Sequence, residues 1–291
     1  MKLDFVVGTG RCGSSLIHEI LASHEDVGFI SNVDDTFPSL RLKGKINNRL
    51  YALTRGMWTR KGGARFAPSE AYRLISSEVS PIYERPCRDL LASDVTPWLR
   101  GRFQDFFEDR WRAQGRRAFL HKYTGWPRIG FFGEIFPKAR FVHIVRDGRA
   151  VANSWLQMTW WGGYLGPGHW PWGPLPRDLD SEWQDSGRSF VSLAGLSWRL
   201  LMESFTQAAG HLGPDQYMEV RYEDFLDSPE SRIRAIAEFL GLPWSRRLAA
   251  SVARVQFDSS RKRPFERELS PAQLDELQRS IRPLLSHYGY E

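Results

Sequence analysis

Cysteine is scarce in this sequence: Cys12 and Cys87 are the only two in 291 residues. One pair cannot supply a disulfide framework, and neither cysteine stands at a spacing typical of metal ligands. The sequence also lacks an apolar run of the roughly 20 residues that a membrane helix needs. Its first residues enter an apolar segment too short for a signal-peptide core. These absences argue against a disulfide-rich secreted fold and a membrane-spanning helix, and they favour a reducing cytoplasm.

Internal repeats and low-complexity segments are also missing. The hydrophobic fraction of 42% and the charged fraction of 25% are typical of a globular protein. The net charge of +6 favours anionic partners such as nucleotides, phosphorylated or sulfated substrates, or nucleic acid. The charge alone does not separate these from a solvated basic surface.

Apolar segments alternate with helical patterns along most of the chain. The expected strands are residues 3–7, 27–30, 118–122, 140–145 and 217–221. Such alternation predicts a parallel sheet covered by helices on both faces. We therefore expect an α/β fold with a P-loop-type parallel sheet, in a single domain spanning residues 1–291.

A tryptophan-rich segment, residues 158–188, interrupts this alternation. It combines several glycines and prolines with Trp160, Trp161, Trp170, Trp172 and Trp183. This composition predicts an ordered insertion or lid over a binding site. A hydrophobic surface for a partner is the alternative. Trp155 and Trp198 lie in helical patterns and are expected in the core.

A glycine-rich turn joins the first strand to the first helix. Its spacing is G-x-x-x-x-G from Gly8 to Gly13, followed by Ser14 and Ser15. Backbone N–H groups in such a turn, together with a helix N-terminus, bind phosphate oxygens. Ser14 replaces the usual P-loop lysine, which argues against a nucleotide kinase or NTPase, and Arg11 supplies a cation within the loop. An ordinary turn capped by Ser14 is the alternative.

A second candidate anion site follows the strand that ends at residue 145. Arg146 stands at the strand end, where open α/β sheets bind ligands, and Ser154 follows about two helical turns later. Both side chains are expected to reach one phosphate. The alternative is that Arg146 and Asp147 form only a helix cap with an ion pair.

Taken together, these segments resemble the PAPS-dependent sulfotransferase family, in its bacterial and tyrosylprotein-like branches; PAPS is 3′-phosphoadenosine-5′-phosphosulfate. Residues 10–15 match the family's 5′-phosphosulfate loop, and residues 145–154 match its 3′-phosphate motif. Residues 136–141 and the Tyr222-Glu223-Asp224 run also match, in the family's order. The resemblance implies transfer of a sulfuryl group from PAPS to a hydroxyl or, less favoured, an amine, with release of PAP and no required metal.

The resemblance also implies the donor-site residues. Arg261, Lys262 and Arg263 resemble the family's basic C-terminal loop. The residues expected to bind PAPS are Gly10, Arg11, Cys12, Gly13, Ser14, Ser15, Arg146, Ser154, Tyr222, Arg261, Lys262 and Arg263.

Catalysis requires a cation near the leaving oxygen and a base near the acceptor. Arg11 and Lys122 are the expected cations, and Arg128 is a third candidate. Cytosolic members carry a histidine where this chain has Thr124, and other branches carry a glutamate just after the second strand. In that region this chain has Asp34 and Asp35, which are the candidate bases; an aspartate helix cap is the alternative.

The acceptor is not readable from these motifs. The aromatic insertion favours a small, partly apolar hydroxylated metabolite or a glycolipid. Two rival functions stay open at this point: a P-loop kinase or NTPase, and a non-catalytic module that binds anionic ligands. We expect no nucleic-acid partner, because the basic residues are dispersed and no nucleic-acid motif is present.

Overall fold

A computed structural model describes residues 1–40, 42–54 and 66–290 of the chain. Its centre is a five-stranded sheet in the order β2-β3-β1-β4-β5, and every pairing is parallel. The strands are β1 (Leu3–Val7), β2 (Val27–Gly28), β3 (Ala118–Lys122), β4 (Phe141–Val145) and β5 (Tyr217–Arg221). The predicted α/β class with a parallel sheet is confirmed.

Strand β2 is shorter than the sequence analysis expected. It ends at Gly28, whereas the apolar run continues to Ile30. The Gln114 side chain explains the difference, because it accepts a hydrogen bond from the Phe29 N–H at 3.0 Å and donates one to the Phe29 carbonyl at 2.9 Å. The amide of Gln114 thus forms the two backbone hydrogen bonds of Phe29 that a neighbouring strand would otherwise form.

Two hydrophobic cores lie on opposite faces of the sheet. In β1, Leu3, Phe5 and Val7 contribute to one core and Val6 to the other, as the alternation of side chains along a strand requires. All four side chains are buried, which explains why this central strand reads as a continuous apolar run.

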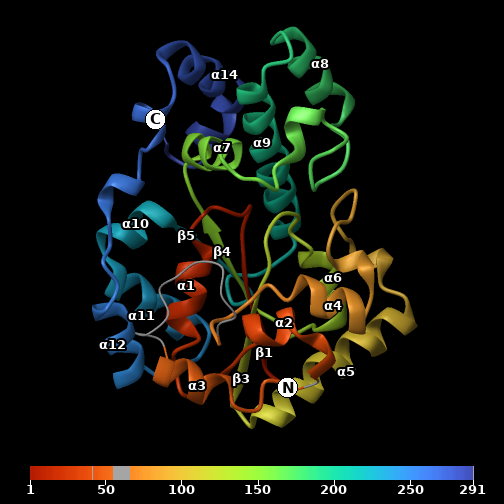
Figure 1. Cartoon of the computed structure of the whole chain (residues 1–291), viewed down its shortest axis with the longest axis vertical. Helices are drawn as coiled ribbons and strands as arrows, with labels where there is room; N and C mark the ends of the chain where they lie inside the picture. The colour runs from red at the N-terminus through yellow and green to blue at the C-terminus, as the bar shows by residue number, and fades with distance from the viewer. Residues whose placement is uncertain (41, 55–65, 291) are drawn as a thin grey trace.

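Helices cover both faces (Figure 1). The core around Val6 is completed by α1 (Ser14–Leu21), α10 (Tyr222–Asp227), α11 (Pro229–Phe239) and α12 (Arg246–Ala253). The core around Phe5 is completed by α4 (Tyr72–Glu78), α5 (Pro97–Gln114), α6 (Ile129–Ile135), α7 (Gly148–Leu156), α9 (Phe190–Ala209) and α14 (Pro271–His287). The shorter helices are α2 (Asn32–Thr36), α3 (Asn47–Thr54), α8 (Arg177–Asp185), α13 (Phe265–Glu268), η1 (Pro38–Leu40), η2 (Pro81–Tyr83), η3 (Ala92–Asp94), η4 (Gly162–Leu165) and η5 (Ser259–Arg261).

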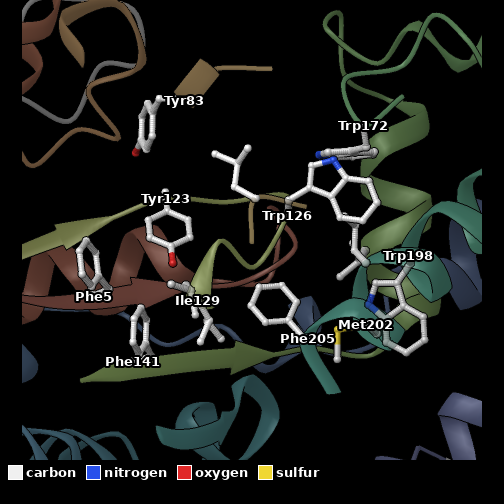
Figure 2. Close-up of a cluster of buried hydrophobic side chains, with 14 of the residues drawn as sticks. Phe5, Tyr83, Tyr123, Trp126, Ile129, Phe141, Trp172, Trp198, Met202 and Phe205 are labelled. Atoms are coloured by element: carbon white, nitrogen blue, oxygen red, sulfur yellow. The ribbon is translucent and has the colours of Figure 1, made fainter. Parts of the chain in front are cut away.

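Aromatic rings dominate the larger core. Phe5 stacks on Phe141 with centroids 5.3 Å apart, and Tyr123 packs edge-on against Phe5 at 5.6 Å (Figure 2). Trp155 and Trp198 are both fully buried, so their predicted place in the core is confirmed. No helix in the described part of the chain is long and apolar enough to cross a membrane.

Candidate active site

The loop between β1 and α1 has the backbone that a phosphate-binding turn requires. Gly10 and Gly13 have φ of 84° and 93°, and Arg11 has φ of 57°, all in the left-handed region. A Cβ on Gly13 would lie 2.2 Å from the ring of Tyr222. Glycine is therefore needed at residue 13 both for its conformation and for the close approach of Tyr222.

Arg11, Arg146 and Ser154 lie together at the carboxyl ends of β1 and β4. The Arg11 Nε donates a hydrogen bond to the Ser154 Oγ at 2.9 Å. The Arg146 Nη1 donates to the Arg11 carbonyl at 2.8 Å, and its Nη2 donates to the Arg261 carbonyl at 2.6 Å. The Arg146 guanidinium also stands 5.0 Å from the centre of the Tyr222 ring. The two predicted anion-binding motifs thus form one site.

The two arginines have no acidic partner in the described part of the chain. Asp147 is adjacent to Arg146, but it caps α7 through the Arg149 N–H and pairs with the Arg149 guanidinium at 2.7 Å. The Arg146 charge is left unpaired, and its Nε is buried without a hydrogen-bond partner. Burial lowers the pKa of Arg11, and the positive charge of Arg146 lowers it further. Such a concentration of unpaired positive charge attracts an anion.

Lys122 joins this loop to a carboxylate. Its side chain is buried, and Nζ donates to the Ser15 Oγ and to Glu70 Oε1, each at 2.7 Å. The same Glu70 oxygen accepts a hydrogen bond from the Thr124 Oγ1 at 3.0 Å. Lys122 therefore lies between the helix that follows the phosphate loop and an acidic group that lines the same cavity.

Glu70 was not found by the sequence analysis, although its place in the fold is close to the expected one. Ser31, just beyond β2, pairs with Pro68 in an isolated antiparallel bridge. The Ser69 N–H also donates to the Ile30 carbonyl at 2.8 Å. The carboxylate thus comes from a segment that lies beside the end of β2 in space but far from it in the chain. No spacing in the sequence signals that pairing.

The structure does not bring Asp34 or Asp35 to the cavity. Asp34 accepts hydrogen bonds from the Ser31 N–H at 2.8 Å and from the Asn47 Nδ2 at 2.6 Å, in a capping box at the start of α2. Asp35 accepts from the Leu74 N–H at 3.0 Å. Both carboxylates serve local structure, as the helix-cap alternative anticipated.

The side chains of Arg128 and His121 form hydrogen bonds within the fold. Arg128 is buried, and its Nη1 donates to the carbonyls of Thr124 and Trp126, each at 3.1 Å. His121 points to the face of β3 opposite Lys122, where its Nε2 lies 2.8 Å from the Tyr83 hydroxyl. The alternation of side chains along a strand explains why these two neighbours on β3 face opposite sides of the sheet.

The basic run at residues 261–263 divides into three environments. Arg261 lines the cavity together with Ser260, and its Nε lies 3.7 Å from Asp258 Oδ2. Lys262 pairs with Asp227, and Arg263 pairs with Glu266 at 2.8 Å. Of the three, only Arg261 is placed to meet a ligand in the cavity. Cys12, another predicted donor residue, is buried in the core around Val6.

One cavity of about 870 Å³ is lined by Arg11, Glu70, Lys122, Arg146, Ser154 and Arg261, together with other residues. We divide its lining into two parts. The loop end comprises Thr9, Gly10, Arg11, Gly13, Ser14, Ser15, Leu16, Arg146, Ala150, Asn153, Ser154, Gln157, Tyr222, Ser260, Arg261, Pro264, Arg267 and Glu268. The indole end comprises Glu70, Tyr72, Glu84, Arg85, Lys122, Thr124, Gly125, Arg128, Trp160, Pro171 and Trp172.

The tryptophan-rich segment contributes two indoles to this lining. Trp160 is 45% exposed, and its ring meets Trp172 edge-on at 6.2 Å. Trp172 also packs on Trp155 of α7, with centroids 4.6 Å apart, and its Nε1 would lie 2.6 Å from a Cβ on Gly125. Trp161 and Trp170 are buried. The segment is thus fixed against the domain by most of its indoles, with Trp160 facing the cavity mouth.

Comparison with known proteins shows the family of this chain. A model of the sulfotransferase family matches residues 5–246. The chain belongs to the sulfotransferase family. The resemblance to this family seen in the sequence is confirmed, while the roles of the loop and of the Arg146 motif stay predictions.

The relatives include bacterial and tyrosylprotein sulfotransferases. Protein-tyrosine sulfotransferase 1 of Danio rerio is 24% identical over 247 residues, covering 84% of this chain and 54% of the relative. Omega-hydroxy-beta-dihydromenaquinone-9 sulfotransferase Stf3 of Mycobacterium bovis is 22% identical over 266 residues, covering 82% of this chain and 62% of the relative. The chain thus spans a little over half the length of these proteins.

The sulfotransferase fold is also seen in a solved structure. Sulfotransferase STF9 from Mycobacterium avium superposes with a TM-score of 0.61 at 14% identity, covering 100% of this chain and 77% of that chain. Among the described residues, no three His, Cys, Asp or Glu side chains are grouped so as to hold a metal ion.

Proposed function

We propose that this sulfotransferase uses PAPS as donor and sulfates a hydroxyl group of a small metabolite or glycolipid, releasing PAP. The observation that carries the proposal is the pair Arg11 and Arg146, two cations around a glycine-rich loop that have no acidic partner among the described residues. The family membership supports the same activity. Because Cys12 and Cys87 are both free, we place the activity in the cytoplasm.

The loop end fits a donor with two anionic groups. We assign the 5′-phosphosulfate to the loop at residues 8–15 and to Arg11, where backbone N–H groups and the start of α1 favour negative charge. We assign the 3′-phosphate to Arg146, Ser154 and Arg261. Tyr222, which lies against both Gly13 and Arg146, would flank the nucleoside.

The junction of the two ends supplies the groups that act on the acceptor. PAPS, when bound, supplies the sulfuryl group and leaves as PAP. We assign Glu70 as the base that accepts the proton of the acceptor hydroxyl. We assign Lys122, held by Ser15 and Glu70, to stabilise the negative charge that develops on the departing oxygen. Arg11 is the second cation for that charge.

The first experiment measures PAP binding by isothermal titration calorimetry without added metal. We expect micromolar binding to the wild type. Arg146→Ala should weaken it by about 1–3 kcal/mol, the scale for losing a charged hydrogen bond. Arg263→Ala is the matched control, because Arg263 pairs with Glu266 and does not line the cavity. It should bind PAP as the wild type does.

Two results would contradict the proposal. One is the absence of PAP binding by the folded protein. The other is binding of ATP only in the presence of magnesium, which would favour the kinase or NTPase alternative.

A further inference from the structure

The cations at the indole end already have acidic neighbours. Lys122 pairs with Glu70 at 2.7 Å. At the cavity mouth the Arg85 Nε lies 3.7 Å from Glu84 Oε1. Each of these positive charges is matched within the protein before any ligand enters.

Arg128, the remaining cation at this end among the described residues, forms no ion pair there and its Nε has no hydrogen-bond partner, but its side chain is buried, at 2% exposure. Its backbone N–H donates to Asp89 Oδ1 at 2.7 Å, and its guanidinium donates to backbone carbonyls. Asp89 faces this charge: burial raises the pKa of Asp89 to about 6, and Arg128 opposes that rise. Asp89 is thus the acidic group that faces Arg128, through a hydrogen bond to the backbone N–H and not through an ion pair with the guanidinium.

The loop end has the opposite arrangement. Arg11 and Arg146 form no ion pair within the described ranges. The one carboxylate in its lining, Glu268, accepts hydrogen bonds from the Asn153 and Gln157 amides at 2.7 and 2.8 Å, and Arg267 is the charged group beside it. Within the described ranges, Arg11 and Arg146 thus place charge without an ion pair where the donor is expected, whereas Lys122 and the exposed Arg85 of the indole end each have a glutamate beside them.

The walls of the indole end suit a ring. Trp160 presents an exposed indole at the mouth, and the ring of Trp172 stands edge-on to it. Pro171 lines the same end of the cavity. Indole faces bind flat apolar surfaces and sugar faces with little loss of conformational entropy. The Tyr72 hydroxyl, by contrast, is already bonded to the Thr124 carbonyl at 3.0 Å.

We infer that the acceptor is an uncharged, ring-bearing phenol or alcohol, and not a tyrosine in an acidic peptide. This inference rests on the proposed sulfotransferase function and narrows its substrate class. Among the residues that the structure describes, an anionic acceptor would find no exposed cation at the indole end without a carboxylate beside it, and it would approach Glu70 and Glu84. Its desolvation and repulsion would oppose binding. A neutral ring has no charge to desolvate and is not repelled by the two glutamates, and it gains contact with the indoles.

The test uses two matched pairs of acceptors with labelled PAPS. The first pair is 2-naphthol and 6-hydroxy-2-naphthoate, which share a ring system and differ in one carboxylate. The second is a tyrosine peptide flanked by glutamate and the same peptide with glutamine. We expect kcat/KM to be higher for the uncharged member of each pair, by about tenfold, the scale of one unpaired charge placed near like charge.

Two variants at the cavity mouth sharpen the test. Glu84→Gln removes the partner of Arg85 and should narrow the preference for 2-naphthol over 6-hydroxy-2-naphthoate severalfold. Arg85→Gln leaves Glu84 unpaired and should widen it. Both side chains are largely exposed, at 40% and 74%, so neither change threatens folding. A ratio that moves the same way in both variants would contradict the inference.

Failure of this inference is distinguishable from failure of the proposed function. Calorimetry with PAP alone tests the donor site. Calorimetry of the PAP complex with the two naphthols then tests the acceptor site without turnover. If PAP binds but 6-hydroxy-2-naphthoate equals or exceeds 2-naphthol in both binding and turnover, the acceptor is not uncharged. If PAP binds and neither naphthol does, the ring-bearing class is wrong.

Discussion

The loop end and the indole end of the cavity satisfy their charges in different ways. At the loop end, Arg11 and Arg146 are held by neutral groups, a serine hydroxyl and backbone carbonyls, so their charge remains available. At the indole end, Lys122 and Arg85 are each neutralised by a glutamate. A site for a multiply charged donor and a site for an acceptor can thus share one cavity without attracting each other's ligands.

The two ends also differ in construction. The loop end depends on one turn after β1 and on the residues after β4, so backbone geometry and a strand end fix it. The indole end assembles segments that meet only in the folded chain, around residues 70, 84, 122 and 160. We expect changes at the loop end to affect PAP binding and changes at the indole end to affect turnover and acceptor choice.

The largest difference between an effect on kcat and an effect on PAP affinity is expected from Glu70→Gln. The variant keeps the shape of the side chain but removes the base, so we expect kcat to fall by about 10²–10⁴-fold, the usual contribution of general base catalysis. PAP affinity, measured by calorimetry, should change little because Glu70 belongs to the indole end.

Asp35→Asn is the matched control for the base. It keeps an oxygen acceptor for the Leu74 N–H and lies outside the cavity lining. We expect kcat close to that of the wild type. A large loss in Asp35→Asn with normal turnover in Glu70→Gln would return the role of base to the residues after β2.

The next largest effect is expected from Gly13→Ala at the loop end. The left-handed backbone costs a residue with a Cβ about 1–2 kcal/mol, and the methyl would meet Tyr222 at 2.2 Å. We expect lower thermal stability and at least a roughly tenfold loss of PAP affinity, the factor that corresponds to 1.4 kcal/mol. Differential scanning fluorimetry and calorimetry measure the two effects.

Gly133→Ala provides the comparison for that variant. Gly133 lies within α6, and a Cβ there would meet no atom within 4 Å. It should stabilise the protein by roughly 0.5–1 kcal/mol, since alanine loses less backbone entropy in a helix. Equal losses of PAP affinity in the two variants would show that Gly13 has no special role at the donor.

The difference in construction explains what the sequence revealed. The parallel sheet, the turn at residues 8–13 and the position of Arg146 and Ser154 beside it were predictable because strand alternation and local spacing determine them. Glu70 was not, because its place depends on the Ser31–Pro68 bridge between distant segments. The early end of β2 depends on Gln114, which lies on α5. Long-range pairings of this kind leave no periodic signal.

The basic run at residues 261–263 also depends on long-range contacts that the sequence does not signal. The sequence predicted Arg261, Lys262 and Arg263 together at the donor, yet Lys262 and Arg263 are paired with Asp227 and Glu266, and Arg261, which lines the cavity, lies 3.7 Å from Asp258. Whether a basic side chain faces a ligand depends on which carboxylates the fold brings near it. The same dependence leaves Arg11 and Arg146 without an ion pair in the described part of the chain, whereas Lys122 and Arg85 each have a glutamate beside them.

A smaller effect is expected from ionic strength. Added salt screens the attraction between PAP and the unpaired arginines of the loop end. We expect PAP affinity to fall about tenfold between 0.05 and 0.5 M salt, since the Debye length shrinks several-fold over that range. The KM for 2-naphthol, with PAPS kept saturating, should change little. Equal salt dependence at both ends would remove the electrostatic distinction between them.

The smallest effect is expected from Tyr83→Phe, behind the indole end. The buried Tyr83 hydroxyl donates to the Glu70 carbonyl at 3.1 Å and meets the His121 Nε2 at 2.8 Å. Burial lowers the pKa of His121, so its neutral ring can donate to Tyr83 while Tyr83 donates to Glu70. Loss of the Tyr83–Glu70 hydrogen bond, worth about 0.5–1.5 kcal/mol, should let Glu70 move from its position and lower kcat several-fold without changing PAP affinity.

Tyr123→Phe is the control. It removes an equally buried hydrogen bond, to the Pro127 carbonyl, and kcat should stay close to that of the wild type. If both variants lose the same fraction of kcat, Tyr83 contributes general stability and does not position Glu70.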